Sequence, residues 1–179
     1  MNIEIRDARK QDVEIVAWTV LTALDMETNE IDKFIRSCSE EDSIYSWRNS
    51  IVATVDGKAV GCLIAYEGSR YKELRNKSWI QLWDDMDLEY LKTIEAETVD
   101  GEFYLDSMAI LPEYRGYSIG KMLLMYAVEK GEKMGCLYST LLVDVHKPKL
   151  EAYYKSIGFE QFGEMKYFGH DYKRMRYAK

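Results

Sequence analysis

The stretch LPEYRGYSIGKMLL, residues 111–124, places an arginine and two glycines in a turn that leads into an apolar helix. The first N–H groups of such a helix have no partner inside it, and the helix dipole adds partial positive charge there. Gly116 and Gly120 allow a ligand to approach the backbone, and Arg115 adds a fork of charged donors. The pattern predicts an anion site, most naturally for a pyrophosphate.

A plainer explanation of the same turn stays open on spacing alone. Gly116 can serve only to reverse the chain, and Arg115 can be a solvated surface charge. The segment is not a P-loop, because it has no Gly-Lys followed by Ser or Thr. It is not the dinucleotide fingerprint GxGxxG either, because Ser118 interrupts that spacing.

Two segments in order carry a resemblance to a known family. LDSMAILPEYRGYSIGKMLL, residues 105–124, resembles the acetyl-CoA motif of the GNAT family of N-acetyltransferases, which reads Arg/Gln-x-x-Gly-x-Gly/Ala at the start of a helix. Ser118 occupies the first glycine position of that motif. EAYYKSIGF, residues 151–159, resembles the family's LY-x-x-x-GF ending. The resemblance covers 103–159 firmly, and over 3–68 it is one of element order only.

The resemblance implies where acetyl-CoA, the co-substrate, would bind. The backbone of Tyr117, Ser118, Ile119, Gly120 and Lys121 would wrap the pyrophosphate, with Arg115 and Gly116 beside it. The strand Met108-Ala109-Ile110 would pair with the pantetheine arm. In this family a bulge on that strand separates it from its parallel neighbour, here residues 138–145, and the thioester lies in the gap.

Tyr154 matches the family position of the general acid that protonates the leaving sulfur. A phenol with a pKa near ~10 is protonated at neutral pH and can serve in that role. The alternative is a packing role, since Tyr153 beside it shows that aromatic residues are common in this helix. Many relatives carry an asparagine seven residues before the tyrosine, where this chain has Lys147.

The general base is less clearly indicated. Glu102, Tyr104, Asp106 and Met108 share one face of their strand if its pairing is regular. Some relatives place a glutamate near the position of Tyr104, which this chain lacks. Asp106 is the first candidate, with a capping or structural role as its alternative. Glu102, His146 and a water chain are the other options.

The amine acceptor is expected to bind among the first helices, the 68–103 region and the final hairpin. The acidic run 84–100, with Trp79 and Trp83 near it, suits a polyamine, aminoglycoside or other cation. The alternative is a solvated acidic face over a small satellite core.

Hydrophobic periodicity predicts the elements that position these residues. A strand opens at Ile3 and Ile5, Asp12 caps a helix over 13–21, and a shorter helix lies around 31–35. The predicted elements that follow are a hairpin of 51–55 and 59–66 about Asp56-Gly57, one or two helices in an insertion over 69–101, strand 103–110, helix 119–134, strand 138–145, helix 149–156 and strand 167–177. They predict an α/β (α+β) fold with a mixed, mostly antiparallel sheet of six to seven strands, flanked by about four helices.

Composition limits the class of protein. With 179 residues, 47% apolar and 31% charged, the chain is typical of one globular domain, 1–179. A net charge of −7 argues against nucleic acid as a partner, and no apolar stretch approaches the ~20 residues of a membrane span. Three scattered cysteines, two histidines and no CxxC favour a reducing cytoplasm and no metal site.

These features together predict an N-acetyltransferase that moves an acetyl group from acetyl-CoA to a primary amine, by direct transfer in a ternary complex. The acceptor is a small molecule or a protein or peptide amine. A homodimer is compatible with the sequence, since relatives often dimerise. The alternative is a non-catalytic acyl-CoA-binding regulatory domain.

Overall fold

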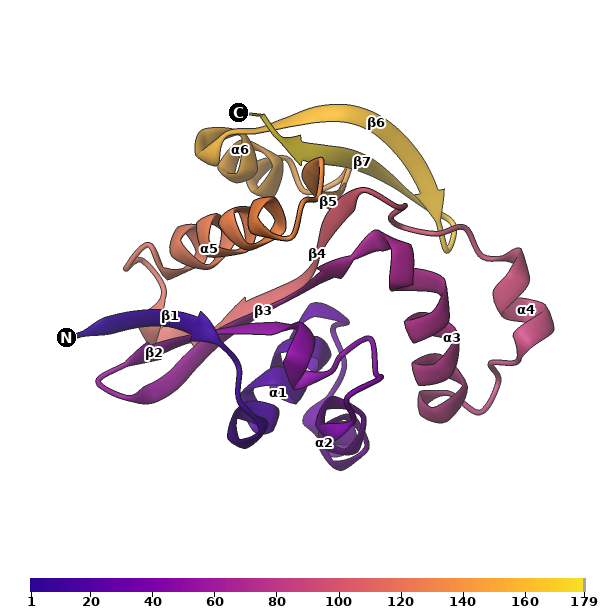
Figure 1. The fold of residues 1–179 in the computed structure, drawn as a ribbon, viewed down its shortest axis with the longest axis horizontal. Helices are drawn as coiled ribbons and strands as arrows, with labels where there is room; N and C mark the ends of the chain where they lie inside the picture. Colours follow the sequence, from indigo (N-terminus) through magenta and orange to yellow (C-terminus); the bar gives the residue numbers. More distant parts are fainter. Residues whose placement is uncertain (179) are drawn as a thin grey trace.

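Seven strands form one sheet in the order β1-β2-β3-β4-β5-β7-β6 (Figure 1). The computed structural model describes residues 1–178. Every neighbouring pair is antiparallel except β4 and β5, which are parallel. The strands are β1 Ile3–Asp7, β2 Ser50–Val55, β3 Lys58–Glu67, β4 Glu102–Ile110, β5 Tyr138–Asp144, β6 Phe159–Tyr167 and β7 His170–Tyr177.

Helices cover both faces of this sheet, so its central strands are buried on both sides. They are α1 Val13–Ala23, α2 Ile31–Ser39, α3 Tyr71–Leu82, α4 Leu88–Thr93, α5 Ile119–Lys133 and α6 Pro148–Ile157. Short 3-10 helices lie at Lys10–Asp12, Thr28–Glu30, Trp47–Asn49, Gly68–Arg70 and Pro112–Tyr114. None of the helices in the described chain combines the length and the hydropathy that a membrane crossing requires.

Two hydrophobic cores lie on opposite faces of the sheet. One packs α1, α2 and α3 against alternate residues of β2, β3 and β4, including Ile64 and Tyr104. The other packs α5 and α6 against the intervening residues, including Leu63 and Phe103. In Figure 1, α1 and α2 accordingly lie below β1 to β4 and α5 above them, with α6 next to α5 under the arch of β6 and β7, while α3 and α4 of the insertion lie at one end.

A bulge in β4 decides which way its side chains point. Ile64 of β3 pairs with Ser107, but the next residue, Ala65, pairs with Leu105, so Asp106 is the extra residue. The expected common face of Glu102, Tyr104, Asp106 and Met108 is therefore wrong at Met108. The bulge reverses the alternation, and Met108 packs on the α5 side while Tyr104 belongs to the α1 side.

Beyond the bulge, β4 separates from its parallel neighbour. β5 pairs with β4 only from Glu102↔Tyr138 to Tyr104↔Thr140. The remainder of β5 pairs with β7 on its other edge. The bulge and the gap implied by the family resemblance are thus both present in the described chain.

The C-terminal strand assignment needs one correction. The strand expected over 167–177 is a hairpin, in which β6 ends at Tyr167 and β7 begins at His170. The sequence of β6, FEQFGEMKY, does not show the alternation of apolar and polar residues that is typical of a strand. Phe162 is a bulge residue, and most of the strand is only partly buried.

The predicted cap at Asp12 is also wrong. Its carboxylate pairs with Arg6 at 2.7 Å and accepts the Arg9 N–H instead of capping α1.

Candidate active site

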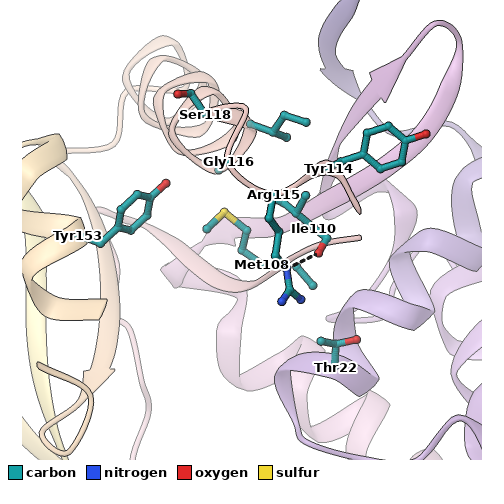
Figure 2. A pocket seen from close by; sticks show the side chains of 11 residues that line it. Thr22, Met108, Ile110, Tyr114, Arg115, Gly116, Ser118 and Tyr153 are labelled. Carbon is teal, nitrogen blue, oxygen red and sulfur yellow. Dashed lines mark hydrogen bonds between the residues drawn. The ribbon is translucent and has the colours of Figure 1, made fainter. Parts of the chain in front are cut away.

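A cavity of about 450 Å³ lies where β4 meets the start of α5 (Figure 2). It is lined by the sequence-predicted residues Met108, Ala109, Ile110, Arg115, Gly116, Ser118, Ile119 and Gly120, together with Thr22, Tyr114 and Tyr153. Tyr117 and Lys121, also predicted to bind the cofactor, are exposed and do not line it. We call this space the donor cavity.

The turn that borders the donor cavity has a left-handed backbone. Gly116 has φ +88° and Ser118 has φ +62°, which glycine adopts freely and serine does not. The Ser118 side chain does not cap α5. At Gly120, a Cβ would come within 2.8 Å of the Tyr153 hydroxyl. The missing side chain at Gly120 therefore gives the Tyr153 hydroxyl room beside the start of α5.

Arg115 is exposed and held over the cavity from one side. Its Nε–H donates to the carbonyl of Ile110 at 3.1 Å, which leaves the two terminal nitrogens free to meet an anion. Figure 2 shows Arg115 and Tyr153 on opposite sides of Met108. The described residues include no acidic partner within ion-pair distance of Arg115.

The free edge of β4 presents backbone groups to this space. Leu111 donates its N–H to Val60 O at 2.9 Å on the β3 side. Since backbone groups alternate along a strand, the N–H groups of Met108 and Ile110 face the other edge, where β5 has separated. The Ile110 carbonyl on that edge accepts from Arg115, as the alternation requires.

A second cavity, of about 480 Å³, lies on the other side of the gap, and we call it the acceptor cavity. Met108 and Thr22 line both cavities, so the two meet at the divergence of β4 and β5. Its other lining residues that bear on chemistry are Trp79, Glu97, Tyr104, Asp106, Tyr154 and Phe168.

Tyr154 lines the acceptor cavity from α6 and is mostly buried. Its ring packs edge-on against Phe159, with centroids 5.9 Å apart. Burial and the neighbouring Tyr153 raise the pKa of Tyr154 to about 12, so the phenol keeps its proton at neutral pH. Its hydroxyl makes no hydrogen bond to the described residues.

Asp106, the bulge residue, faces the same cavity. It accepts hydrogen bonds from the Tyr66 hydroxyl at 2.6 Å and the Ser107 hydroxyl at 2.7 Å. Burial raises the pKa of Asp106, and these two hydrogen bonds oppose the rise.

Glu97 is the functional candidate that sequence reasoning missed. It precedes β4 and accepts hydrogen bonds from the hydroxyls of Tyr71, at 2.9 Å, and of Tyr104. Burial and the negative charge of Asp106 raise the pKa of Glu97 to about 7. The sequence held one signal: Tyr104 stands where some relatives carry a glutamate, and here its hydroxyl holds Glu97 from a different segment.

The other base candidates lie elsewhere. Glu102 is buried and held by Arg174 at 2.7 Å and by Thr98 at 2.8 Å, which gives it a structural role. His146 is exposed and does not line the acceptor cavity, whereas its neighbour Lys147 does.

The insertion divides into two parts with different roles. Its acidic residues from Asp84 to Glu89 are exposed, and Asp87 caps α4 by accepting the N–H of Tyr90 at 2.8 Å. Trp83 packs edge-on against Phe34, with centroids 6.0 Å apart. The acidic face is therefore solvated as the alternative expected, but the residues beneath it belong to the core that packs α1 and α2 and do not form a satellite core. Only Trp79 and Glu97 reach the acceptor cavity.

Comparison with known proteins agrees with this geometry. A sequence model described as the acetyltransferase (GNAT) family matches residues 18–159. A crystal structure of an acetyltransferase superposes with a TM-score of 0.81 at 26% identity, covering 98% of each chain. An N-acetyltransferase from Staphylococcus aureus Mu50 gives a TM-score of 0.80 at 24% identity, over 97% of this chain and 99% of that one.

A more distant neighbour is a structure of the NatC complex bound to Gag peptide and CoA. It has a TM-score of 0.61 at 16% identity, over 100% of this chain and 99% of that one. At that identity the likeness concerns the fold alone. No curated protein sequence matches this chain.

Proposed function

Because the chain belongs to the acetyltransferase (GNAT) family, we propose that it transfers the acetyl group of acetyl-CoA to a primary amine, directly, with both substrates bound. The observation that carries this proposal is the meeting of the two cavities at Met108, where β4 leaves β5. Such an arrangement brings two reactants together in one orientation, which supplies a large part of the acceleration.

The residues of the donor cavity suit a coenzyme A moiety. Arg115 and the first residues of α5 line the cavity, and the N–H groups at this helix start would hold the pyrophosphate together with the Arg115 guanidinium. The space beside Gly116, where an added Cβ would meet no atom within 4 Å, leaves room for the pyrophosphate to approach. The free edge of β4 at Met108 and Ile110 would pair with the pantetheine amides. When bound, acetyl-CoA supplies an activated carbonyl and a thiol leaving group.

We assign the chemistry to three groups of this chain. Tyr154 holds a proton for the leaving sulfur, since its phenol stays neutral at physiological pH. A backbone N–H on the free edge of β4, at Met108 or Ile110, stabilises the charge that develops on the carbonyl oxygen. Asp106 on the acceptor side attracts the amine and favours its loss of a proton.

The proposed setting is the cytoplasm. Cys38, Cys62 and Cys136 are free thiols, and the first two are buried. Burial raises the pKa of Cys62 to about 12, which makes it a packing residue and not a nucleophile.

The test is a calorimetric titration of acetyl-CoA into the purified protein, followed by thiol release with a panel of primary amines. The proposal expects micromolar binding and thiol release that depends on the amine. Binding with no release from any amine would instead support the non-catalytic acyl-CoA-binding domain. Absence of binding would refute the assignment of the donor cavity.

A further inference from the structure

Glu97 and Asp106 line the acceptor cavity without a cationic partner, and a third carboxylate of the lining, Asp144, accepts the N–H of His146. Among the described residues, Glu97 and Asp106 accept hydrogen bonds from hydroxyl groups, and neither takes part in an ion pair. Arg75, on the nearby helix α3, donates instead to backbone carbonyls such as that of Leu91 at 2.8 Å. Negative charge that is partly removed from water and unpaired favours the binding of a cation.

Aromatic side chains from α3, α6 and the C-terminal hairpin form part of the wall of this cavity. Tyr71 of α3 and Tyr167 of β6 join their hydroxyls at 3.1 Å, which links the insertion to the C-terminal hairpin. Trp79 and Phe168 lie beside this link, with ring centroids 5.9 Å apart. Aromatic rings beside a pair of carboxylates suit an amine with an apolar part.

Phe168 has a backbone conformation with positive φ, which is unfavourable for a phenylalanine. It forms a two-residue hairpin turn with Gly169, since Tyr167 pairs with His170. Both turn residues have positive φ, +47° at Phe168 and +78° at Gly169. Asparagine is favoured at the first position of such a turn, and a bulky aromatic residue is rare there. The conformation places the ring on Trp79, at the lining of the acceptor cavity.

We propose that the acceptor is a small primary monoamine with an apolar or aromatic remainder. Its ammonium group lies at Glu97 and Asp106, and its remainder lies against Trp79 and Phe168. This inference rests on the proposed acetyl transfer and identifies its acceptor class and its base. The carboxylate pair of Glu97 and Asp106 is the base, and Glu97 is the member that sequence reasoning missed.

The proton balance of the reaction agrees with these roles. The ammonium gives one proton to the carboxylate pair and becomes a neutral amine. The C–N bond forms as the C–S bond breaks. The second proton of the nitrogen goes to the sulfur through Tyr154, which donates one proton and regains one. The carboxylate pair later releases its proton to solvent, so one proton is released for each amide formed.

The groups that surround Glu97 leave the carboxylate pair as the titrating unit near neutral pH. The charge of Glu97 acts on six tyrosines, Tyr45, Tyr66, Tyr71, Tyr104, Tyr167 and Tyr172. Burial raises the pKa of each, so all remain neutral. Asp106 is the acid whose charge raises the pKa of Glu97, and because the two interact they titrate as a pair. Asp144 and Lys147 are the other charged residues of the cavity lining.

The first test replaces Glu97 by glutamine, with Glu95→Gln as the matched control, since Glu95 is exposed on the same segment. We expect Glu97→Gln to lower kcat for phenethylamine about 100-fold and to leave the Kd of acetyl-CoA unchanged. We expect the wild-type rate to rise with pH through about 7, as the pair loses its proton. Glu97→Gln loses this rise, and Glu95→Gln keeps it. Wild-type kcat and pH profile in Glu97→Gln would overturn the base assignment.

The titration of Glu97 can also be measured directly, without enzyme turnover. Carbon-13 NMR of the glutamate carboxyls follows their titration in the protein without substrates, and Glu97→Gln identifies the signal. A glutamate that titrates near pH 7 supports the inference. Titration of Glu97 near the ordinary glutamate pKa of about 4.3 contradicts it. This measurement separates failure of the inference from failure of the proposed function, which is judged by thiol release from the wild-type protein.

The second test replaces Phe168 by asparagine, which suits the turn better but removes the ring. We expect the KM for phenethylamine to rise about tenfold, with the Kd of acetyl-CoA unchanged and Tm raised by about 2 °C. Putrescine and an alanine tetrapeptide serve as the other acceptors, and both should be poorer than phenethylamine in the wild-type protein. Preference for the peptide, or an unchanged KM in Phe168→Asn, would overturn the acceptor class.

Discussion

The donor cavity and the acceptor cavity are built in different ways. The donor cavity takes most of its lining from one continuous stretch, Met108 to Gly120, in which a strand, a turn and a helix start follow one another. The acceptor cavity takes Trp79 from α3, Glu97 from the loop before β4, Tyr154 from α6 and Phe168 from the C-terminal hairpin. The residues proposed to bind acetyl-CoA are thus neighbours in the sequence. The residues proposed to select the acceptor come together only when distant segments fold against one another.

Removing the hydroxyl of Tyr154 affects the acceptor cavity and should have the largest effect in this series. Tyr154→Phe should lower kcat about 100-fold at saturating acetyl-CoA, because the leaving sulfur loses its proton donor. Calorimetry should show an unchanged Kd for acetyl-CoA. Tyr90→Phe, at an exposed site on α4, is the control and should behave as the wild type. A fully active Tyr154→Phe enzyme would make Tyr154 a packing residue.

Arg115→Ala affects the donor cavity alone. Loss of a charge-assisted contact to the pyrophosphate should weaken acetyl-CoA binding about tenfold, or about 1.4 kcal/mol. Acetyl-pantetheine, which lacks the pyrophosphate, should bind both proteins equally. Tm should not change, since the side chain is exposed. Equal affinity of both proteins for acetyl-CoA would remove the pyrophosphate from this turn.

Ser118→Gly should produce the smallest effect, and it should be stabilising. Glycine relieves the left-handed backbone at φ +62° but adds freedom to the unfolded chain, for a net gain of about 0.5–1 kcal/mol. Thermal unfolding should show Tm raised by about 1–3 °C. Ser156→Gly, inside α6, is the matched control and should lower Tm. A drop in Tm for Ser118→Gly would mean that the serine side chain supports the turn.

Features that depend on neighbouring residues could be predicted from the sequence, and features that depend on distant segments could not. The hairpin at Asp56-Gly57, the helix start at Pro148 and the turn at Arg115 depend on neighbours in the chain, and their sequence signals were sufficient. The hairpin at Phe168 was missed because a phenylalanine occupies a turn position where asparagine is typical.

Long-range contacts account for what the sequence left open at the site. The bulge at Asp106 becomes visible only through its register with β3, and it reverses the face of Met108. Glu97 belongs to an acidic run whose other members from Asp84 to Glu89 are solvated, and nothing local distinguishes it from them. Its contacts with Tyr71 and Tyr104 arise only after folding.

The most direct test of the central claim is a mass-spectrometric measurement of acetyl transfer. Acetyl-CoA with a carbon-13 label in its acetyl group is incubated with the protein and phenethylamine, and the amide and free thiol are counted. The account predicts one labelled N-acetyl product for each coenzyme A released, and little product from Glu97→Gln in the same time. Thiol release without labelled amide, or equal product from both proteins, would contradict it.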